Sequence, residues 1–139
     1  MFTARFYLLI SALSGMSAVA LGAFGAHGLK KLVSPELLAA YQTGVQYQFI
    51  HTLALLAIAI LLLLVKPTPG LKNKLKISAS LMIVGIVLFS GSLYSMTFMS
   101  VAGGFPAWLG PITPIGGLSF IIAWILLAVA VFKLPTAEQ

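Results

Sequence analysis

The sequence predicts an all-α integral membrane protein with four transmembrane helices, on three observations. Of its 139 residues, 60% are hydrophobic and only 7% are charged, whereas soluble domains carry about 25% charged residues. Four apolar stretches, at residues 6–26, 47–65, 77–101 and 114–132, match the ~30 Å hydrocarbon core of a bilayer. The Lys and Arg residues fall between these stretches or beside them. We therefore expect one four-helix membrane domain over residues 1–139.

The first stretch follows Arg5. A cleaved signal peptide is the alternative, but the apolar run is long for one and three further spans follow, so we favour a helix. Ser14, Ala18 and Gly22 recur every four residues, which predicts a helix-packing face because small side chains let helices approach closely in lipid. The alternative is that small residues are simply common in membrane helices. Gly28 is expected to end this helix in the left-handed conformation.

The second helix has a clear start signal at Ser34-Pro35-Glu36. Serine is a good N-cap, proline fits the first helical position, and a first-turn carboxylate faces the positive end of the helix dipole. A helix from Ser34 to Val65 would measure ~46 Å, longer than a ~30 Å hydrocarbon core. Residues 35–48 therefore either lie in the interface or continue the second span.

Polar side chains lead into this span and form the candidate binding site. At ~100° per residue, Glu36, Tyr47 and His51 fall on one side of the helix. A buried histidine needs a partner, so His51 either bonds a backbone carbonyl or hydroxyl, which we favour, or joins a proton-sensitive or solute-binding cluster. The candidate polar cluster comprises His27, Glu36, Gln42, Gln46, Tyr47 and His51.

The third and fourth spans carry their own packing signals. Ser78, Gly85 and Ser92 recur every seven residues and predict a second helix-packing face. A Gly- and Pro-rich loop at 102–111 then leads to the last span, where Thr113 is expected to cap the helix and Pro114 to occupy its first turn. In this last span Trp124 lies deep in the membrane, where its indole N–H needs a partner.

Lysine and arginine placement predicts the orientation. With the loop around Pro67 in the cytoplasm, six of the eight basic residues lie inside, and only Lys30 and Lys31 lie outside. We therefore expect the N- and C-termini in the cytoplasm.

Composition also bears on other function classes. Eight scattered basic residues are too few for a phosphate-tracking face, so we expect no nucleic-acid partner despite the net charge of +6. Without cysteine, thiolate metal sites are excluded, and no His pair has ligand spacing, so we expect no metal and no cofactor. The only acids are Glu36 and Glu138, and no strained nucleophile turn is visible, so we expect no enzyme.

Four ordered blocks of sequence resemble one family. They are Leu21-Gly22-Ala23-Phe24-Gly25-Ala26-His27-Gly28-Leu29; Tyr41-Gln42-Thr43-Gly44-Val45-Gln46-Tyr47-Gln48 with His51; Phe89-Ser90-Gly91-Ser92-Leu93-Tyr94; and Pro111-Ile112-Thr113-Pro114-Ile115-Gly116-Gly117 with Trp124. The set resembles the YgdD/YwdK family of small bacterial inner-membrane proteins, which also has eukaryotic relatives. The resemblance implies a four-helix integral protein of the bacterial inner membrane and implies no activity.

Two function hypotheses remain. The first is a structural or accessory component that contacts the lipid bilayer and forms a homo-oligomer or joins a membrane complex, motivated by the small-residue faces and the near absence of charge in the spans. The alternative is a transporter or channel for a small solute, ion or proton, formed by an oligomer because four helices leave little room for a pathway. We favour the first.

Overall fold

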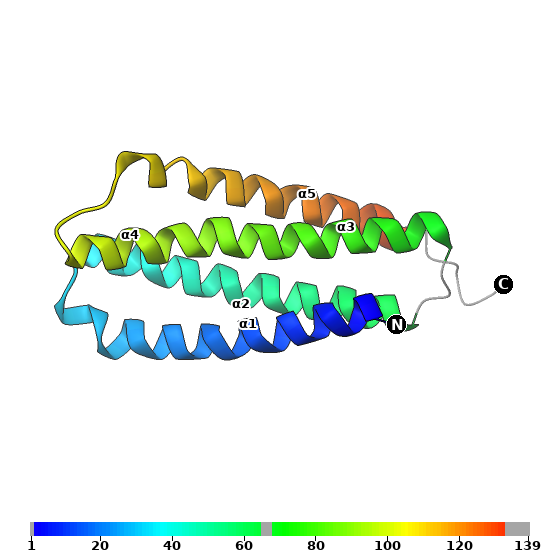
Figure 1. Cartoon of the computed structure of the whole chain (residues 1–139), viewed down its shortest axis with the longest axis horizontal. Coiled ribbons are helices and arrows are strands. Elements are labelled where there is room, and N and C mark those ends of the chain that lie inside the picture. The colour runs from blue at the N-terminus through cyan, green and yellow to red at the C-terminus, as the bar shows by residue number, and fades with distance from the viewer. Residues whose placement is uncertain (1, 65–67, 133–139) are drawn as a thin grey trace.

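The computed structural model describes residues 2–64 and 68–132 and, across them, a bundle of helices (Figure 1). The long helices are α1 (Phe2–His27), α2 (Pro35–Leu64), α3 (Pro69–Gly85), α4 (Gly91–Val101) and α5 (Ile112–Phe132), and the short elements are η1 (Leu29–Lys31), η2 (Ile86–Ser90) and η3 (Ala107–Leu109). Because η2 joins α3 to α4 without a break, the described residues hold four helices that are long and apolar enough to cross a membrane. The predicted fold class is confirmed.

The four long helices run side by side in alternating directions (Figure 1). Two of them, α2 and the combined α3–η2–α4 helix, contact each other along their length, while α1 packs mainly on α2 and α5 packs on α3 and η2. The α1–α2 and α4–α5 connections lie at one end of the bundle, and α1 and α3 begin at the other. This arrangement matches a chain that crosses a bilayer four times.

The start of α2 follows the predicted signal. The backbone N–H of Leu37 donates to Ser34 Oγ at 3.4 Å, so the serine caps the helix. From Pro35 the helix continues unbroken for 30 residues, or about 45 Å at ~1.5 Å per residue. Residues 35–48 therefore continue the second span instead of forming a separate interfacial segment.

Three local expectations were wrong. Gly28 has a φ of −84° and is not left-handed; a Cβ there would lie 2.6 Å from the Phe24 ring, so glycine is needed for space. The sequence pattern placed Lys72, Lys74 and Lys76 in the connection between the second and third spans, but they belong to the first turns of α3. Helix α5 begins at Ile112, one residue before Thr113, and the Thr113 hydroxyl bonds Ser92 Oγ at 2.7 Å instead of capping.

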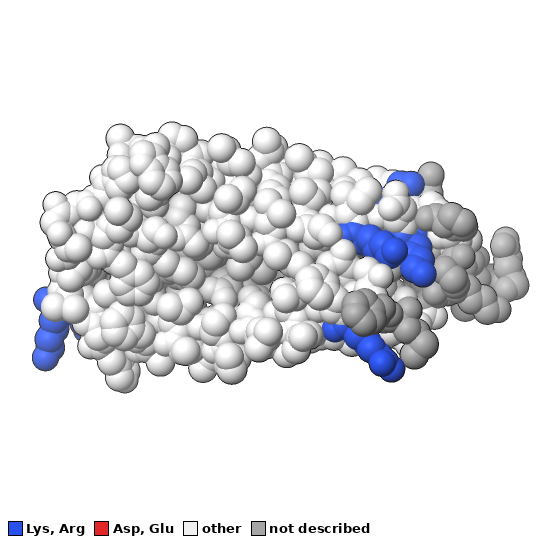
Figure 2. All heavy atoms as spheres, in the orientation of Figure 1, with Lys and Arg blue, Asp and Glu red and all other residues white. Residues whose placement is uncertain are grey.

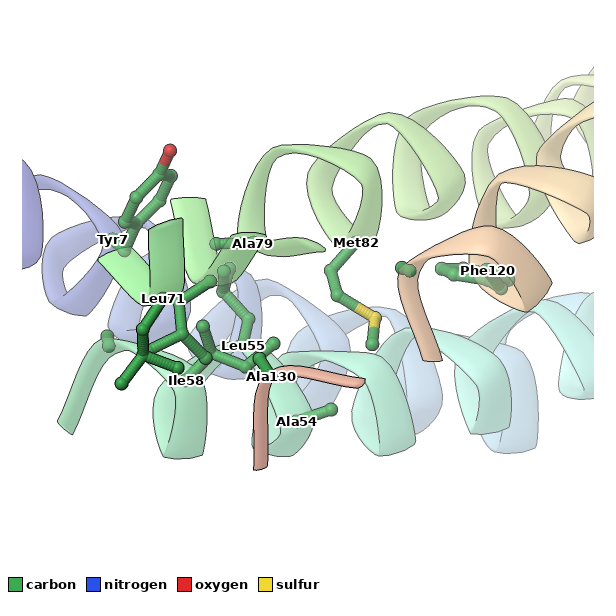
Figure 3. Close-up of a cluster of buried hydrophobic side chains, with 12 residues drawn as sticks. Tyr7, Ala54, Leu55, Ile58, Leu71, Ala79, Met82, Phe120 and Ala130 are labelled. Carbon is green, nitrogen blue, oxygen red and sulfur yellow. The ribbon is translucent and has the colours of Figure 1, made fainter. Parts of the chain in front are cut away.

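The apolar core joins side chains of α2, α3 and α5, and α1 contributes Tyr7 (Figure 3). Leu55 and Ile58 of α2 and Met82 of α3 are fully buried, and Phe120 of α5 is 3% exposed. Lipid tails are as apolar as these side chains, so their tight packing stabilises the bundle mainly through van der Waals contact.

Hydrogen bonds from side chains to backbone carbonyls of neighbouring helices recur through the bundle. Between α3 and α5, Ser78 Oγ donates to the Ala123 carbonyl at 2.7 Å and Ser119 Oγ donates to the Leu81 carbonyl at 2.9 Å. Between α2 and α1, Tyr41 donates to the Leu21 carbonyl at 2.9 Å. Such bonds satisfy hydroxyls that have no water to bind in a hydrocarbon core.

The centre of the combined helix is a π-helical turn, η2, held between two glycines. Ser90 Oγ donates to the Gly44 carbonyl of α2 at 2.7 Å. On the other side, a Cβ at Gly116 of α5 would lie 2.4 Å from the backbone N of Phe89. The missing side chains let α2 and α5 approach the widened turn, and this approach places Phe89 between them. Single π turns inside α-helices occur frequently at functional sites.

Candidate functional site

The structure divides the predicted polar cluster into two parts. Tyr47 and His51 lie together with ring centroids 5.6 Å apart. The other four members, His27, Glu36, Gln42 and Gln46, are exposed on α1 and α2. His51 is only 5% exposed, whereas Tyr47 is 38% exposed. The two rings that remain together therefore form the centre of the candidate site.

His51 is held by its own helix and by an aromatic stack. Its Nδ1 lies 2.7 Å from the Tyr47 carbonyl, which can only accept, so Nδ1 carries the proton and Nε2 is a hydrogen-bond acceptor. The imidazole stacks on Phe120 of α5 with centroids 3.4 Å apart and an interplanar angle of 12°. His51 therefore bonds a backbone carbonyl of its own helix through one of its two ring nitrogens.

A groove of about 540 Å³ opens beside His51, between α2, η2 and α5. Tyr47 and His51 line it from α2, Phe89 from η2, and Phe120 and Trp124 from α5. Tyr47 stacks on Phe89 with centroids 4.4 Å apart, and Trp124 meets His51 edge to face at 6.2 Å. The aromatic groove, as we call this site, is thus built from three segments that are distant in sequence.

A second polar group, centred on Gln48, escaped the sequence prediction. Its Nε2 donates to the Ser14 carbonyl at 3.0 Å and to Ser17 Oγ at 2.9 Å, and its Oε1 accepts from the Tyr94 hydroxyl at 2.7 Å. Gln48 is 5% exposed and so joins α1, α2 and α4 through the bundle interior. The available signal was the spacing of Tyr41, Gly44 and Gln48, since residues at i, i+3 and i+7 share one helix face.

The predicted packing residues of the first span lie at the α1–α2 contact. Ser14 Oγ lies 2.6 Å from Thr52 Oγ1, Ala18 is fully buried, and a Cβ at Gly22 would lie 3.3 Å from Val45.

Those of the third span lie against α5. Ser78 bonds the backbone of α5, a Cβ at Gly85 would lie 2.4 Å from the Phe120 ring, and Ser92 bonds Thr113. Both sets therefore sit where helices approach closely.

Charge is confined to the ends of the bundle. On the face shown in Figure 2, Lys and Arg gather at the two ends and a broad uncharged band separates them. Within residues 6–29, 37–64 and 77–132 the sequence has no charged side chain. In the described part of the chain, no group of three or more His, Asp or Glu residues is placed to hold a metal ion.

These features define a class: a small polytopic membrane protein, a four-helix bundle whose polar side chains bond one another and whose uncharged flank faces lipid. Comparison with known proteins then gives the family. Residues 21–117 match the family model described as a protein of unknown function, DUF423. The chain belongs to this family, which its relatives' names place among the UPF0382 membrane proteins.

The similar proteins cover nearly the whole chain. A UPF0382 membrane protein of Haemophilus influenzae is 45% identical over 128 residues, 91% of this chain and 94% of that protein. YwdK of Bacillus subtilis is 41% identical, covering 93% and 98% of the two chains, and the inner membrane protein YgdD of Escherichia coli K12 is 38% identical, covering 95% and 93%. The predicted resemblance to the YgdD/YwdK family is confirmed. No solved structure matches the chain significantly.

Proposed function

We propose that this protein is a structural or accessory component of the membrane, which acts by associating with itself or with another membrane protein and not by catalysis. The observation that carries the proposal is the use of the interior polar groups: in the described residues, no buried side-chain N or O atom lacks a hydrogen-bond partner. Some of these groups join helices, as Ser78 and Ser119 do. Others bond back to their own helix, as Ser11 and Thr97 do, so the bundle uses their bonding capacity internally.

The uncharged flank supports the same proposal. Large apolar side chains such as Leu9, Leu53 and Ile121 are each more than half exposed, and they lie on three different helices. In a bilayer these faces contact lipid or a partner helix, and close packing with a partner gains van der Waals contact that fluid lipid does not supply.

The transport alternative has less support from the geometry. A proton or ion pathway needs ionisable groups or water-filled space at depth, and the spans carry no charged side chain. Glu36, the acid of the predicted cluster, is exposed in the first turn of α2 and apart from His51.

By relation to YgdD, whose name places it in an inner membrane, we propose the bacterial inner membrane as the location. Both termini would lie in the cytoplasm, because Arg5 and the basic first turns of α3 share one end of the bundle.

The proposal is tested by the mass of the purified particle. Extracted in a mild detergent and measured by light scattering, the protein should form a dimer, a larger oligomer or a stoichiometric complex. A strict monomer without any co-purifying protein would contradict it.

A flux assay in liposomes distinguishes the accessory role from the transport alternative. In liposomes, the wild type, His51→Ala and Glu36→Gln should show the same background flux of protons and small cations. Flux above that of empty liposomes, lost in His51→Ala, would favour the transport alternative.

A further inference from the structure

Hydrogen-bonding groups without an intramolecular partner gather in the aromatic groove. Nδ1 of His51 is occupied by the Tyr47 carbonyl, which leaves Nε2 as an acceptor. Within residues 2–64 and 68–132, no hydrogen bond is found for His51 Nε2 or for the indole N–H of Trp124. Among the described residues that are not exposed, no buried polar atom lacks a partner, so Nε2 of His51 must be accessible. Trp124 is 44% exposed, and both side chains line the groove.

The depth of these groups makes water a poor partner for them. His51 lies about 24 Å from the start of α2 and about 20 Å from its end, at ~1.5 Å per residue. It is therefore near the middle of a membrane-spanning helix. A polar group without a partner at that depth costs free energy. A bound molecule that bonds both groups removes this cost and therefore binds more tightly.

His51 Nε2 and the Trp124 N–H together favour a ligand that carries a hydroxyl group. His51 Nε2 requires a donor, and the Trp124 N–H requires an acceptor. A hydroxyl does both, because its hydrogen can be donated to the imidazole while its oxygen accepts from the indole. A ketone or ether oxygen would serve Trp124 alone.

The aromatic side chains that line the groove favour a ligand with a flat ring. Phe120 stacks under His51, and Phe89 stacks on Tyr47, so the groove presents aromatic faces from α5, η2 and α2. Its volume of about 540 Å³ lies within the ~300–1,000 Å³ of small-molecule sites. Because the groove lies on the apolar flank of the bundle, an apolar tail on the ring could extend into the lipid.

We propose that the aromatic groove binds a membrane-soluble molecule that carries a hydroxyl on a flat ring and an apolar tail, in the chemical class of alkylphenols and long-chain hydroquinones. The hydroxyl bonds His51 and Trp124, and the ring lies against Phe89 and Phe120. This inference is independent of the accessory role, since a monomer that binds such a molecule would leave it intact.

Fluorescence of Trp124 provides the test. Trp108→Phe removes the other tryptophan, which lies outside the groove in η3. In nanodiscs, this variant is titrated with a ring-brominated para-decylphenol and, as the matched ligand, with its methyl ether, because bromine quenches indole at contact. We expect saturable quenching by both, with the phenol binding about 3- to 10-fold more tightly, as one net neutral hydrogen bond implies.

A pair of histidine variants locates the effect. In the same background, His51→Phe keeps the stack on Phe120 but removes the acceptor, and it should bind phenol and ether equally. His27→Phe changes the other histidine, exposed at the end of α1, and should keep the preference for phenol. Equal binding of phenol and ether by the His51-containing protein, linear quenching without saturation, or no quenching because a second copy covers Trp124 would each overturn the proposal.

Discussion

The contact between α5 and the π-helical turn η2 can be tested sharply, because two adjacent glycines of α5 lie at different distances from η2. A Cβ built at Gly116 would lie 2.4 Å from the Phe89 N and 2.8 Å from its Cα, whereas at Gly117 the nearest atom is in the Phe89 side chain at 3.8 Å. Ordinary contacts begin near 3.4 Å. Gly116→Ala must therefore push α5 away from η2 by about 1 Å, while Gly117→Ala fits without movement.

The magnitude follows from comparing the two variants. Each replaces a helical glycine with alanine, and each gains the same ~1 kcal/mol of helix propensity. Their difference isolates the overpacking at Gly116, which typically costs about 1–3 kcal/mol. At ~1.4 kcal/mol per tenfold, this cost lowers the ratio of folded to unfolded protein by about 5- to 150-fold.

Unfolding in mixed micelles supplies the measurement. The free energy of unfolding is obtained for the wild type and both variants by titration with a denaturing detergent, followed by helical circular dichroism. Gly117→Ala should equal or exceed the wild type, and Gly116→Ala should lie clearly below Gly117→Ala. Equal stability of the two variants would refute the close approach of α5 to η2.

Three further predictions address the interior and the topology. Gln48→Leu removes a side chain with partners on two other helices and should lower the free energy of unfolding by about 1–3 kcal/mol. Its control, Gln46→Leu, changes an exposed residue of the same helix and should be nearly neutral in the same titration. Ser90→Ala loses a 2.7 Å hydrogen bond to the α2 backbone and should lower the free energy of unfolding by about 0.5–1.5 kcal/mol. An unchanged midpoint of the detergent titration would show that this bond contributes nothing to stability. Because the chain has no cysteine, single cysteines at Lys72 and Gly104 can be labelled with an impermeant maleimide in intact cells, and only the second should react; labelling of both would contradict four crossings.

The sequence predicted the helices well because each carries its own signals. The apolar runs match a bilayer, and the Ser34-Pro35 start and the Gly- and Pro-rich loop mark helix ends. These signals act within one segment, so no partner needs to be known. Errors arose where a neighbouring helix decides the outcome, as at Thr113, whose hydroxyl bonds Ser92 of α4 instead of capping its own helix.

The candidate site was predictable only in part. His51 and Tyr47 stand four residues apart on one helix, so their proximity follows from helix periodicity. Phe89 and Phe120 come from other segments, and the π turn that places Phe89 lies in an apolar run without any local signal. Gln48 was passed over because a polar run at a helix start resembles an exposed face until the opposing helix is placed.

The side-chain-to-carbonyl bonds between helices have a consequence for how such a fold can evolve. Each bond needs a particular donor, such as Ser78 or Tyr41, but its acceptor is main chain that any residue supplies. The acceptor positions, Ala123 and Leu21, are therefore free to mutate within the limits of size while the bond persists. Substitutions at the two ends of such a contact have no reason to be correlated, so pairwise covariation across homologues should be weak at these side-chain-to-carbonyl bonds.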